Sequence, residues 1–267
     1  MIALIIIILI LFLALLFLIA PQKASKEQKE KFIGRYYAHR GLHKTDGSAP
    51  ENSLPAFKLA AQKGYGIELD VHITTDDQIV VFHDDDLKRM CGVDKATEDN
   101  SYEELKSLRL LDTEHTSPLF TEVLSVYNAA GPIVLEFKTG KRKYELCQQT
   151  YEILKTYKGD VCIESFDPRI VAWWKKNAPE YVRGQLAQPT KFYKGQSVFL
   201  SFALANSLLN FLGRPHFVAY KLAKKPFGTL LCEMLGAMRF SWTSKDILDK
   251  TNQDGIIFEG YEPPAYL

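Results

Sequence analysis

The sequence has almost no net charge and few cysteines, and both shortages limit what the protein can be. Its 33 basic and 32 acidic residues leave a formal net charge of +1. A nucleic-acid-binding domain normally carries a clear excess of basic residues, so the bulk charge gives no reason to expect a nucleic-acid partner. Size is not limiting, because 267 residues are enough for one large α/β barrel or two small domains.

The cysteines are too scattered to form a metal site or a disulfide framework. Cys91, Cys147, Cys162 and Cys232 include no Cys-x-x-Cys pair, and no histidine stands at zinc-binding spacing from them. A chain of this size does not need disulfides to fold. We therefore expect four free thiols in a reducing compartment.

Charged and polar side chains are missing altogether from residues 2–20. As a helix this run would span roughly 28 Å, close to the hydrocarbon thickness of a bilayer. A cleaved signal peptide is the alternative, but it would need a basic start and a small-x-small cleavage site, and here only Met1 precedes the run and Pro21-Gln22 follows it. We predict an uncleaved transmembrane anchor over residues 1–22.

Basic side chains follow this apolar run, and none precedes it. Residues 23–34 are expected to form a polar, partly helical linker. The positive-inside rule then predicts a single-pass membrane protein whose C-terminal domain lies in the cytoplasm. The basic residues on that side are Lys23, Lys26, Lys29, Lys31 and Arg35.

From residue 35 to residue 267 short β-branched or aromatic runs alternate with amphipathic stretches. This alternation is typical of an α/β fold, a (β/α)₈ TIM-type barrel. The expected strands are 36–39, 66–70, 133–138, 161–166, 183–187, 217–220, 238–242 and 255–259. The expected helices are 53–63, 121–130, 141–157, 168–177 and 244–251.

A ninth run, residues 79–83, breaks the alternation. Only a few residues separate it from 71–74, whereas a parallel crossover needs a dozen or more. We therefore expect an antiparallel hairpin that turns near residues 75–78. If the turn centres on Asp76-Asp77, the numbers of paired residues sum to about 153, and His83 lies beside Asp70.

Carboxylates stand where strands of the predicted barrel end, which is where barrels of this kind place their active sites. Glu68 and Asp70 are two residues apart and share a strand face, and Glu136 belongs to the next predicted barrel strand. Apolar neighbours make surface ion pairs a poor alternative. Three carboxylates form the all-oxygen set that Mg²⁺ or Ca²⁺ prefers, so we predict a metal site.

Two histidines and two cations accompany these carboxylates. A single histidine is more often structural, but His39 and His83 converging on three carboxylates favour acid and base roles. Arg40 and Lys138 are expected to bind phosphate, and Trp242, at another strand end, to contact the substrate. The remaining histidines lack such neighbours and are interpreted as structural: His43, His72, His115 and His216.

The order and spacing of these motifs resemble the glycerophosphodiester phosphodiesterase family. The matching segments run from about residue 36 to residue 259 and read HRG, PENS, ELDV, VVFHD, PLFTEVL, LEFK, ESFD, FSWT and DGII. The resemblance implies a metal-dependent barrel with an insertion, here about residues 84–118. It also implies that His39 and His83 are the acid/base pair, and that the three carboxylates bind the metal.

The chain departs from the family pattern at three points. Asp77 stands where glycine is common, Ser244-Lys245 where Val-Asn often occurs, and Phe258-Glu259 where Thr-Asp is typical. These departures leave the predicted catalytic set intact.

The expected activity is metal-dependent hydrolysis of glycerophosphodiesters to glycerol 3-phosphate and an alcohol. Two alternatives stay open: a lysophospholipase D that acts on membrane lysophospholipids, and a non-catalytic membrane scaffold. A second apolar stretch, residues 198–212, is too short and polar to span a bilayer. We interpret it as a helix or loop covering the strand ends, or alternatively as an apolar rim that meets lipid or acyl chains.

Overall fold

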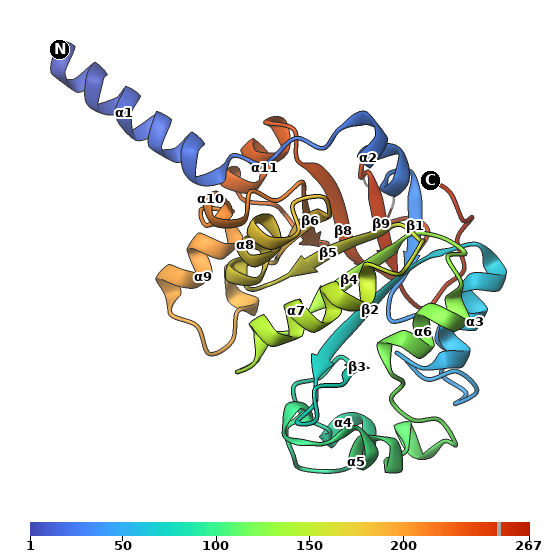
Figure 1. Cartoon of the computed structure of the whole chain (residues 1–267). Helices are drawn as coiled ribbons and strands as arrows, with labels where there is room; N and C mark the ends of the chain where they lie inside the picture. The colour runs from blue at the N-terminus through green and yellow to red at the C-terminus, as the bar shows by residue number, and fades with distance from the viewer. Residues whose placement is uncertain (250–251) are drawn as a thin grey trace.

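The computed structural model describes residues 1–249 and 252–267 and forms a closed barrel of eight parallel strands (Figure 1). The strands are β1 (Arg35–Ala38), β2 (Gly66–Ile73), β4 (Ile133–Phe137), β5 (Val161–Ser165), β6 (Val182–Ala187), β7 (Phe217–Lys221), β8 (Met238–Ser244) and β9 (Gly255–Phe258). Each pairs with the next, and β1 pairs with both β2 and β9, which closes the ring. The expected TIM-type barrel is confirmed.

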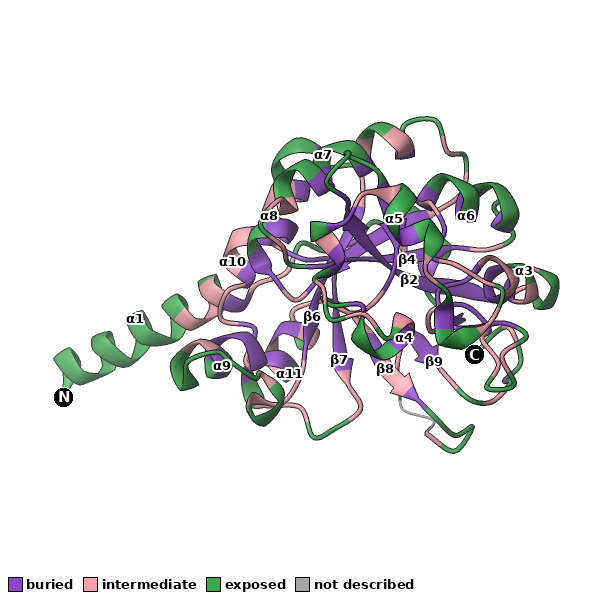
Figure 2. Cartoon of the chain, turned by 90° about the horizontal axis from the view of Figure 1, so that it is seen from below, coloured by how far each residue is buried: buried purple, intermediate pink, exposed green. Residues whose placement is uncertain are grey.

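Helices cover the outside of the barrel, and their apolar faces pack on the strands (Figure 2). They are α3 (Leu54–Lys63), α6 (Phe120–Tyr127), α7 (Lys143–Leu154), α8 (Pro168–Asn177), α9 (Val198–Ala205), α10 (Asn210–Gly213) and α11 (Phe227–Met234). Local signals fix their ends. Asp167 accepts a hydrogen bond from the backbone N–H of Arg169 and so caps α8, while Gly64, at a φ of +71°, ends α3.

The expected helix over residues 244–251 is wrong in its described part. Ser244 continues β8 and pairs with Phe258 of β9. After it, the Asp249 carboxylate accepts hydrogen bonds from the backbone N–H groups of Lys245 and Asp246, which stabilises a turn in place of a helix. Residues 250 and 251 of this prediction lie outside the described residues.

The ninth strand, β3 (Ile79–Val81), runs antiparallel to β2 as expected, but its register differs by one residue. The observed pair Val71↔Val81 sums to 152 and not to 153. The reason is a three-residue loop between Thr74 and Gln78, in which Asp77 adopts a φ of +63°. Such loops favour glycine at the left-handed position, where this chain has aspartate. Phe82, and not His83, is therefore opposite Asp70, and its N–H donates to the Asp70 carbonyl at 3.0 Å.

The chain between β3 and α6 forms a small lobe beside the barrel, lowest in Figure 1. It contains α4 (Lys88–Cys91) and α5 (Tyr102–Ser107) and has its own apolar cluster with Val80 and Phe82 of the hairpin. The lobe therefore packs on the hairpin that carries His83. All four cysteines lie within the described residues and are free thiols, as expected.

An apolar helix, α1 (Ile2–Ile19), projects from one side of the barrel and leads to α2 (Lys26–Phe32) (Figures 1 and 2). Its 18 residues have a mean hydropathy of 3.7, and only 6% of them are buried. By length and composition it can cross a membrane, although a signal sequence passes the same test.

The C-terminal end of α1 is part of the folded domain. Ile19 is fully buried in an apolar cluster with residues of β6, β7 and α11. Arg214 closes this end by donating hydrogen bonds to the carbonyls of Phe17 and Ala20, at 2.6 and 2.9 Å. The last turn of the helix is thereby fastened to the barrel.

Candidate active site

Three buried carboxylates converge at the C-terminal ends of β2 and β4. Glu68 and Asp70 alternate along β2 and share a face, and Glu136 of β4 is in register with Asp70. One oxygen from each lies within 4.8 Å of the others, and no side chain of the three is more than 11% exposed. The sequence placed all three at the site, and the structure brings them together. This acidic triad can bind a metal, and its all-oxygen donor set suits a hard divalent cation.

The carboxylates do not share one protonation state. Burial and the neighbouring charge of Asp70 raise the pKa of Glu68 well above its ordinary value, and burial also raises the pKa of Glu136. Burial opposes ionisation of Asp70 as well, but the ammonium of Lys138 and other nearby positive charges outweigh it and lower the pKa of Asp70. Asp70 is thus the member of the triad that ionises most readily.

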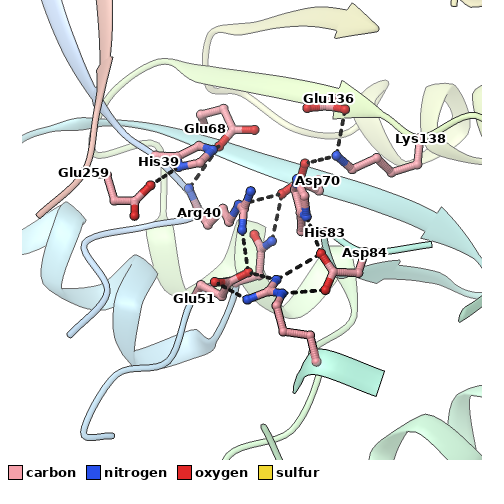
Figure 3. A network of polar contacts seen from close by, with 12 residues as sticks. His39, Arg40, Glu51, Glu68, Asp70, His83, Asp84, Glu136, Lys138 and Glu259 are labelled. Atoms are coloured by element: carbon pink, nitrogen blue, oxygen red, sulfur yellow. Dashed lines mark hydrogen bonds and ion pairs between the residues drawn. The ribbon is translucent and has the colours of Figure 1, made fainter. Parts of the chain in front are cut away.

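The two cations expected to bind phosphate are both paired with carboxylates. The Lys138 ammonium lies 2.7 Å from both Asp70 and Glu136. The Arg40 guanidinium donates to Glu51 at 2.7 Å, and its Nε is 3.8 Å from Asp70. Figure 3 shows them on opposite sides of Asp70. Each keeps further N–H groups for an anion, since guanidinium has five and ammonium three.

His39 follows β1 directly and is held from one side. Its Nδ1 donates to Glu259 at 2.8 Å, while its Nε2 is 3.9 Å from Glu68 (Figure 3). Burial lowers the pKa of His39 to about 4, against the opposing hydrogen bond to Glu259. The ring is therefore neutral near pH 7, and its proton-free Nε2 is on the side of the carboxylate triad.

The backbone conformation around His39 limits which residues the HRG and PENS segments can contain. Arg40 and Asn52 both have a φ of +55°, and the Asn52 N–H donates to the Arg40 carbonyl at 2.9 Å. The Asn52 side chain then donates to Asp70 at 2.9 Å. Gly41 has a φ of +79°, and a Cβ there would come within 2.9 Å of Ala56 in α3.

His83 reaches the site despite the shifted register. Its ring lines the same cavity as Glu68 and Glu136. Its Nδ1 donates to Asp84 at 2.5 Å, and Arg89 of α4 bridges Asp84 and Glu51, with its shortest contact to each at 2.6 Å. Figure 3 shows this network running from His83 to Glu51. The inserted lobe therefore helps to hold His83.

A cavity of about 740 Å³ opens beside the triad and is lined by both histidines. Trp242 also lines it. Its indole Nε1 donates to the Ala219 carbonyl at 3.0 Å, and its ring contacts Phe166 at 5.6 Å between centroids. The Lys221 ammonium lies 4.8 Å from the centre of the Trp242 ring. Trp242 thus faces the cavity, as the sequence indicated.

The sequence reasoning missed several polar residues of the site. Glu164 of β5 is 1% exposed beside Glu136, and burial raises its pKa well above the ordinary value. Its position at a strand end was a usable signal, and the same holds for Glu259 after β9. For two others the motifs were the signal, because Glu51 belongs to PENS and Asp84 to VVFHD, whereas nothing in the sequence singled out Arg89.

Comparisons with known proteins agree with this geometry. A model of the glycerophosphoryl diester phosphodiesterase family matches residues 39–245. The chain is 32% identical over 151 residues to lysophospholipase D GDPD1 of Rattus norvegicus, covering 52% of this chain and 46% of that protein. It is 38% identical over 114 residues to a glycerophosphodiester phosphodiesterase of Bacillus altitudinis, covering 39% and 44%. The chain therefore spans about half the length of the curated relatives it matches.

Solved structures show the same barrel. A phosphodiesterase of Oleispira antarctica, in complex with the product sn-glycerol-3-phosphate, is 22% identical with a TM-score of 0.69, over 86% of this chain and 94% of that one. The glycerophosphodiester phosphodiesterase of Thermotoga maritima is 25% identical with a TM-score of 0.63, over 84% and 93%.

Proposed function

Because the chain belongs to the glycerophosphoryl diester phosphodiesterase family, we propose that it hydrolyses glycerophosphodiesters, with a divalent metal, to glycerol 3-phosphate and an alcohol. One observation carries the proposal: Glu68 and Glu136 of the carboxylate triad line one cavity together with His39 and His83, and Asp70 lies beside them. A non-catalytic scaffold would have no need for a buried, mutually repelling carboxylate cluster at the barrel mouth.

The carboxylate triad is the proposed metal site, and its oxygens suit Mg²⁺ or Ca²⁺. The Lys138 ammonium, 2.7 Å from Asp70 and Glu136, stands where positive charge is most favourable, which supports this assignment. A bound divalent metal would supply charge neutralisation for the phosphate.

The histidines are the proposed proton carriers. His39, neutral near pH 7 with Nδ1 held by Glu259, takes a proton at its Nε2 from the attacking group. That group is a water molecule, or a glycerol hydroxyl of the substrate, in which case water afterwards opens the cyclic phosphate that forms. The oxygen then bonds to phosphorus, and the bond from phosphorus to the alcohol oxygen breaks. His83, held through Nδ1 by Asp84, gives its Nε2 proton to the leaving alcohol. Arg40 and Lys138 hold the phosphate oxygens with their remaining N–H groups, and Trp242 contacts the substrate across the cavity.

The test is release of glycerol 3-phosphate from glycerophosphocholine, glycerophosphoethanolamine and glycerophosphoglycerol, with Mg²⁺, Ca²⁺ or chelator. We expect turnover only with metal, and a fall in kcat of about 10²- to 10⁴-fold in both His39→Ala and His83→Ala, the usual range for acid–base groups. Metal-dependent turnover that survives in both variants would overturn the assigned roles.

A second candidate function is lysophospholipase D activity on membrane lysolipids. The relative from Rattus norvegicus bears that name, and α1 would keep the cavity near a bilayer. Adding lysophosphatidylcholine to the same substrate panel distinguishes lysophospholipase D activity from hydrolysis of soluble glycerophosphodiesters. A kcat/KM for this lipid above that for glycerophosphocholine would favour the second function.

The proposed location is the membrane, with α1 as a retained single-pass anchor and the barrel in the cytoplasm. The burial of Ile19 in the barrel cluster supports retention, and the basic residues after α1 support the orientation. Protease added to intact cells should leave the barrel whole. Degradation from outside would overturn the orientation.

A further inference from the structure

Exposed apolar side chains gather on two neighbouring helices, α9 and α11. On α9, Val198 and Phe199 are each 81% exposed and Phe202 is 51% exposed. On α11, Phe227 is 67% and Met234 82% exposed, with Leu230 also exposed. We call these six residues the α9–α11 surface.

The two helices form one surface because they are joined at close range. The Ser207 and Thr229 hydroxyls lie 3.1 Å apart, and the Thr229 hydroxyl donates to the Ala205 carbonyl at 2.8 Å. Gly228 lies so close to Asn206 that a Cβ would come within 2.2 Å of the Asn206 carbonyl oxygen. The polar groups between the helices are therefore satisfied inward, and the apolar side chains remain outside.

This surface is continuous with the base of α1. Figures 1 and 2 both show α9, α10 and α11 gathered around the C-terminal end of α1, on one side of the barrel. The packing agrees, because Leu15, Leu18 and Ile19 share a cluster with Leu231 of α11 and with Leu235, which follows that helix. Whatever apolar medium surrounds the exposed part of α1 also comes next to the α9–α11 surface.

The charge around the surface is strongly one-sided. Residues 188–236 contain a single acidic residue, Glu233, and its carboxylate is paired with Lys225 at 2.5 Å. Within the part of the chain that the structure describes, Lys191, Lys194 and Lys224 have no carboxylate partner. The basic residues of the segment are Lys191, Lys194, Arg214, Lys221, Lys224 and Lys225. A chain of net charge +1 therefore concentrates positive charge around its exposed apolar helices.

We propose that the α9–α11 surface is a second membrane contact, which lies in the headgroup region of a bilayer rich in anionic lipid. Apolar side chains flanked by lysines are the combination that binds such an interface. The occupant is the bilayer that α1 enters, because α11, which carries three of the six surface residues, packs against the last turns of α1. This inference rests on the proposed anchoring of α1.

The contact would bring lipid to the wall of the active-site cavity. Gln188 and Leu222 line the cavity, and loops of nine and four residues lead from them into α9 and α11. A bilayer held by these helices therefore lies beside one wall of the cavity. Substrates at the membrane surface, such as a lysolipid with its headgroup in water, are the class this arrangement favours.

The experiment places a tryptophan reporter on the surface of the full chain, reconstituted in phosphatidylcholine vesicles with brominated acyl chains, with or without phosphatidylglycerol. Phe199→Trp is the reporter, and Tyr144→Trp, on α7 and 48% exposed in the wild type, is the matched control. The wild type supplies the background of its three native tryptophans. Far-UV circular dichroism and glycerophosphocholine hydrolysis check that both variants fold.

We expect the bromolipid to quench the Phe199→Trp reporter and not the Tyr144→Trp control, with stronger quenching when phosphatidylglycerol is present. Replacing Lys191, Lys194 and Lys224 together by Gln should weaken that lipid dependence several-fold. The control for the change in net charge replaces three exposed lysines elsewhere by Gln, and it should leave the dependence on phosphatidylglycerol intact. These lysines are Lys88, Lys106 and Lys158.

The outcomes distinguish failure of the proposed α9–α11 contact from failure of the proposed α1 anchor. If the chain floats with the vesicles and the two reporters are quenched equally, the membrane contact is overturned while the anchor stands. If the chain does not float and neither reporter is quenched, the anchor is wrong and the contact, which rests on it, fails with it. Equal quenching of that reporter with and without phosphatidylglycerol would overturn the preference for anionic lipid.

Discussion

At the scale of single residues, the site depends on buried charges that hold one another in unequal protonation states. Glu68, Glu136 and Glu164 are pushed toward their neutral forms by burial and mutual repulsion, whereas Asp70 stays charged beside Lys138. Such a cluster is unfavourable for folding and favourable for cation binding. Changing one member should therefore affect activity and stability in opposite directions.

Glu68→Gln tests this opposition. Glutamine cannot ionise to bind a metal, but it keeps an oxygen to accept the backbone N–H of Arg40, which lies 2.9 Å from the Glu68 carboxylate in the wild type. We expect kcat/KM to fall by more than about 100-fold, beyond the usual loss from changing a residue that only supports a metal ligand. The melting temperature of the metal-free protein should stay the same or rise. A marked fall in that temperature would show that the carboxylate serves the fold and not the metal.

His216 gives the protein a defined acid sensitivity away from the site. It is fully buried, and burial lowers its pKa to about 4. Below pH ~6.5 a histidine in the unfolded chain binds a proton, whereas folded His216 stays neutral until about pH 4. The unfolded state therefore gains protons first, and the free energy of unfolding should fall through this window, on the order of 3 kcal/mol at most.

His216→Gln should flatten that loss, because glutamine keeps an acceptor for the Arg183 N–H, which His216 accepts at 3.2 Å, and does not titrate. Urea unfolding of metal-free protein at pH 7, 5.5 and 4.5 measures it. If the free energy of unfolding falls with pH equally in the variant and the wild type, His216 is not the source of the acid sensitivity.

The sequence predicted the parts of the site that follow from local periodicity. Glu68, Asp70 and Glu136 could be placed because residues two apart share a strand face and parallel strands end together. The partner of His39 could not be identified in this way, since Glu259 is 220 positions away and its contact depends on the closure of β9 onto β1. The sequence marked Phe258-Glu259 only as a departure from the family pattern.

At the scale of elements, the hairpin and the inserted lobe together deliver His83. The predicted register was wrong by one residue because the loop has three residues with Asp77 in the left-handed conformation, a choice that the strand pattern does not reveal. The lobe holds His83 in the site in spite of this register, since Arg89 binds Asp84 and Asp84 accepts the hydrogen bond of the His83 ring. The lobe is thus part of the proposed catalytic arrangement as well as an insertion.

Arg89→Ala tests this link between the lobe and the site. Without the bridge from Asp84 to Glu51, His83 should lose its fixed orientation, and we expect kcat to fall by about 10-fold with little change in KM. Arg89→Lys should not restore the rate, because one ammonium cannot make both two-pronged contacts. Arg109→Ala, in the same lobe but outside the cavity, is the control. A normal kcat in Arg89→Ala would mean that the hairpin alone holds His83.

At the scale of the whole molecule, α1 is both an apolar helix and a packed part of the barrel. The sequence predicted its length and apolar character, but it gave no sign that Leu15, Leu18 and Ile19 would pack against α11. Apolarity alone cannot distinguish lipid contact from protein contact. The structure divides the helix into an exposed N-terminal part and a docked last turn.

Ile19→Ala should therefore destabilise the folded domain by about 2–5 kcal/mol, as expected for a large-to-small change in a core. Ile8→Ala, at a side chain that is 58% exposed, should have no comparable effect. Thermal unfolding in detergent compares the two. Equal melting temperatures would mean that the end of α1 is not packed on the barrel in solution.

The central claim, that the barrel cuts glycerophosphodiesters at the alcohol side of the phosphorus, is tested most directly by phosphorus NMR. The full chain is incubated with glycerophosphocholine and Mg²⁺ or Ca²⁺, and the phosphorus signals are followed in time. Our account predicts that the diester signal is replaced by that of glycerol 3-phosphate, and that chelator stops the change. A product signal of phosphocholine, or an unchanged diester with either metal, would contradict it.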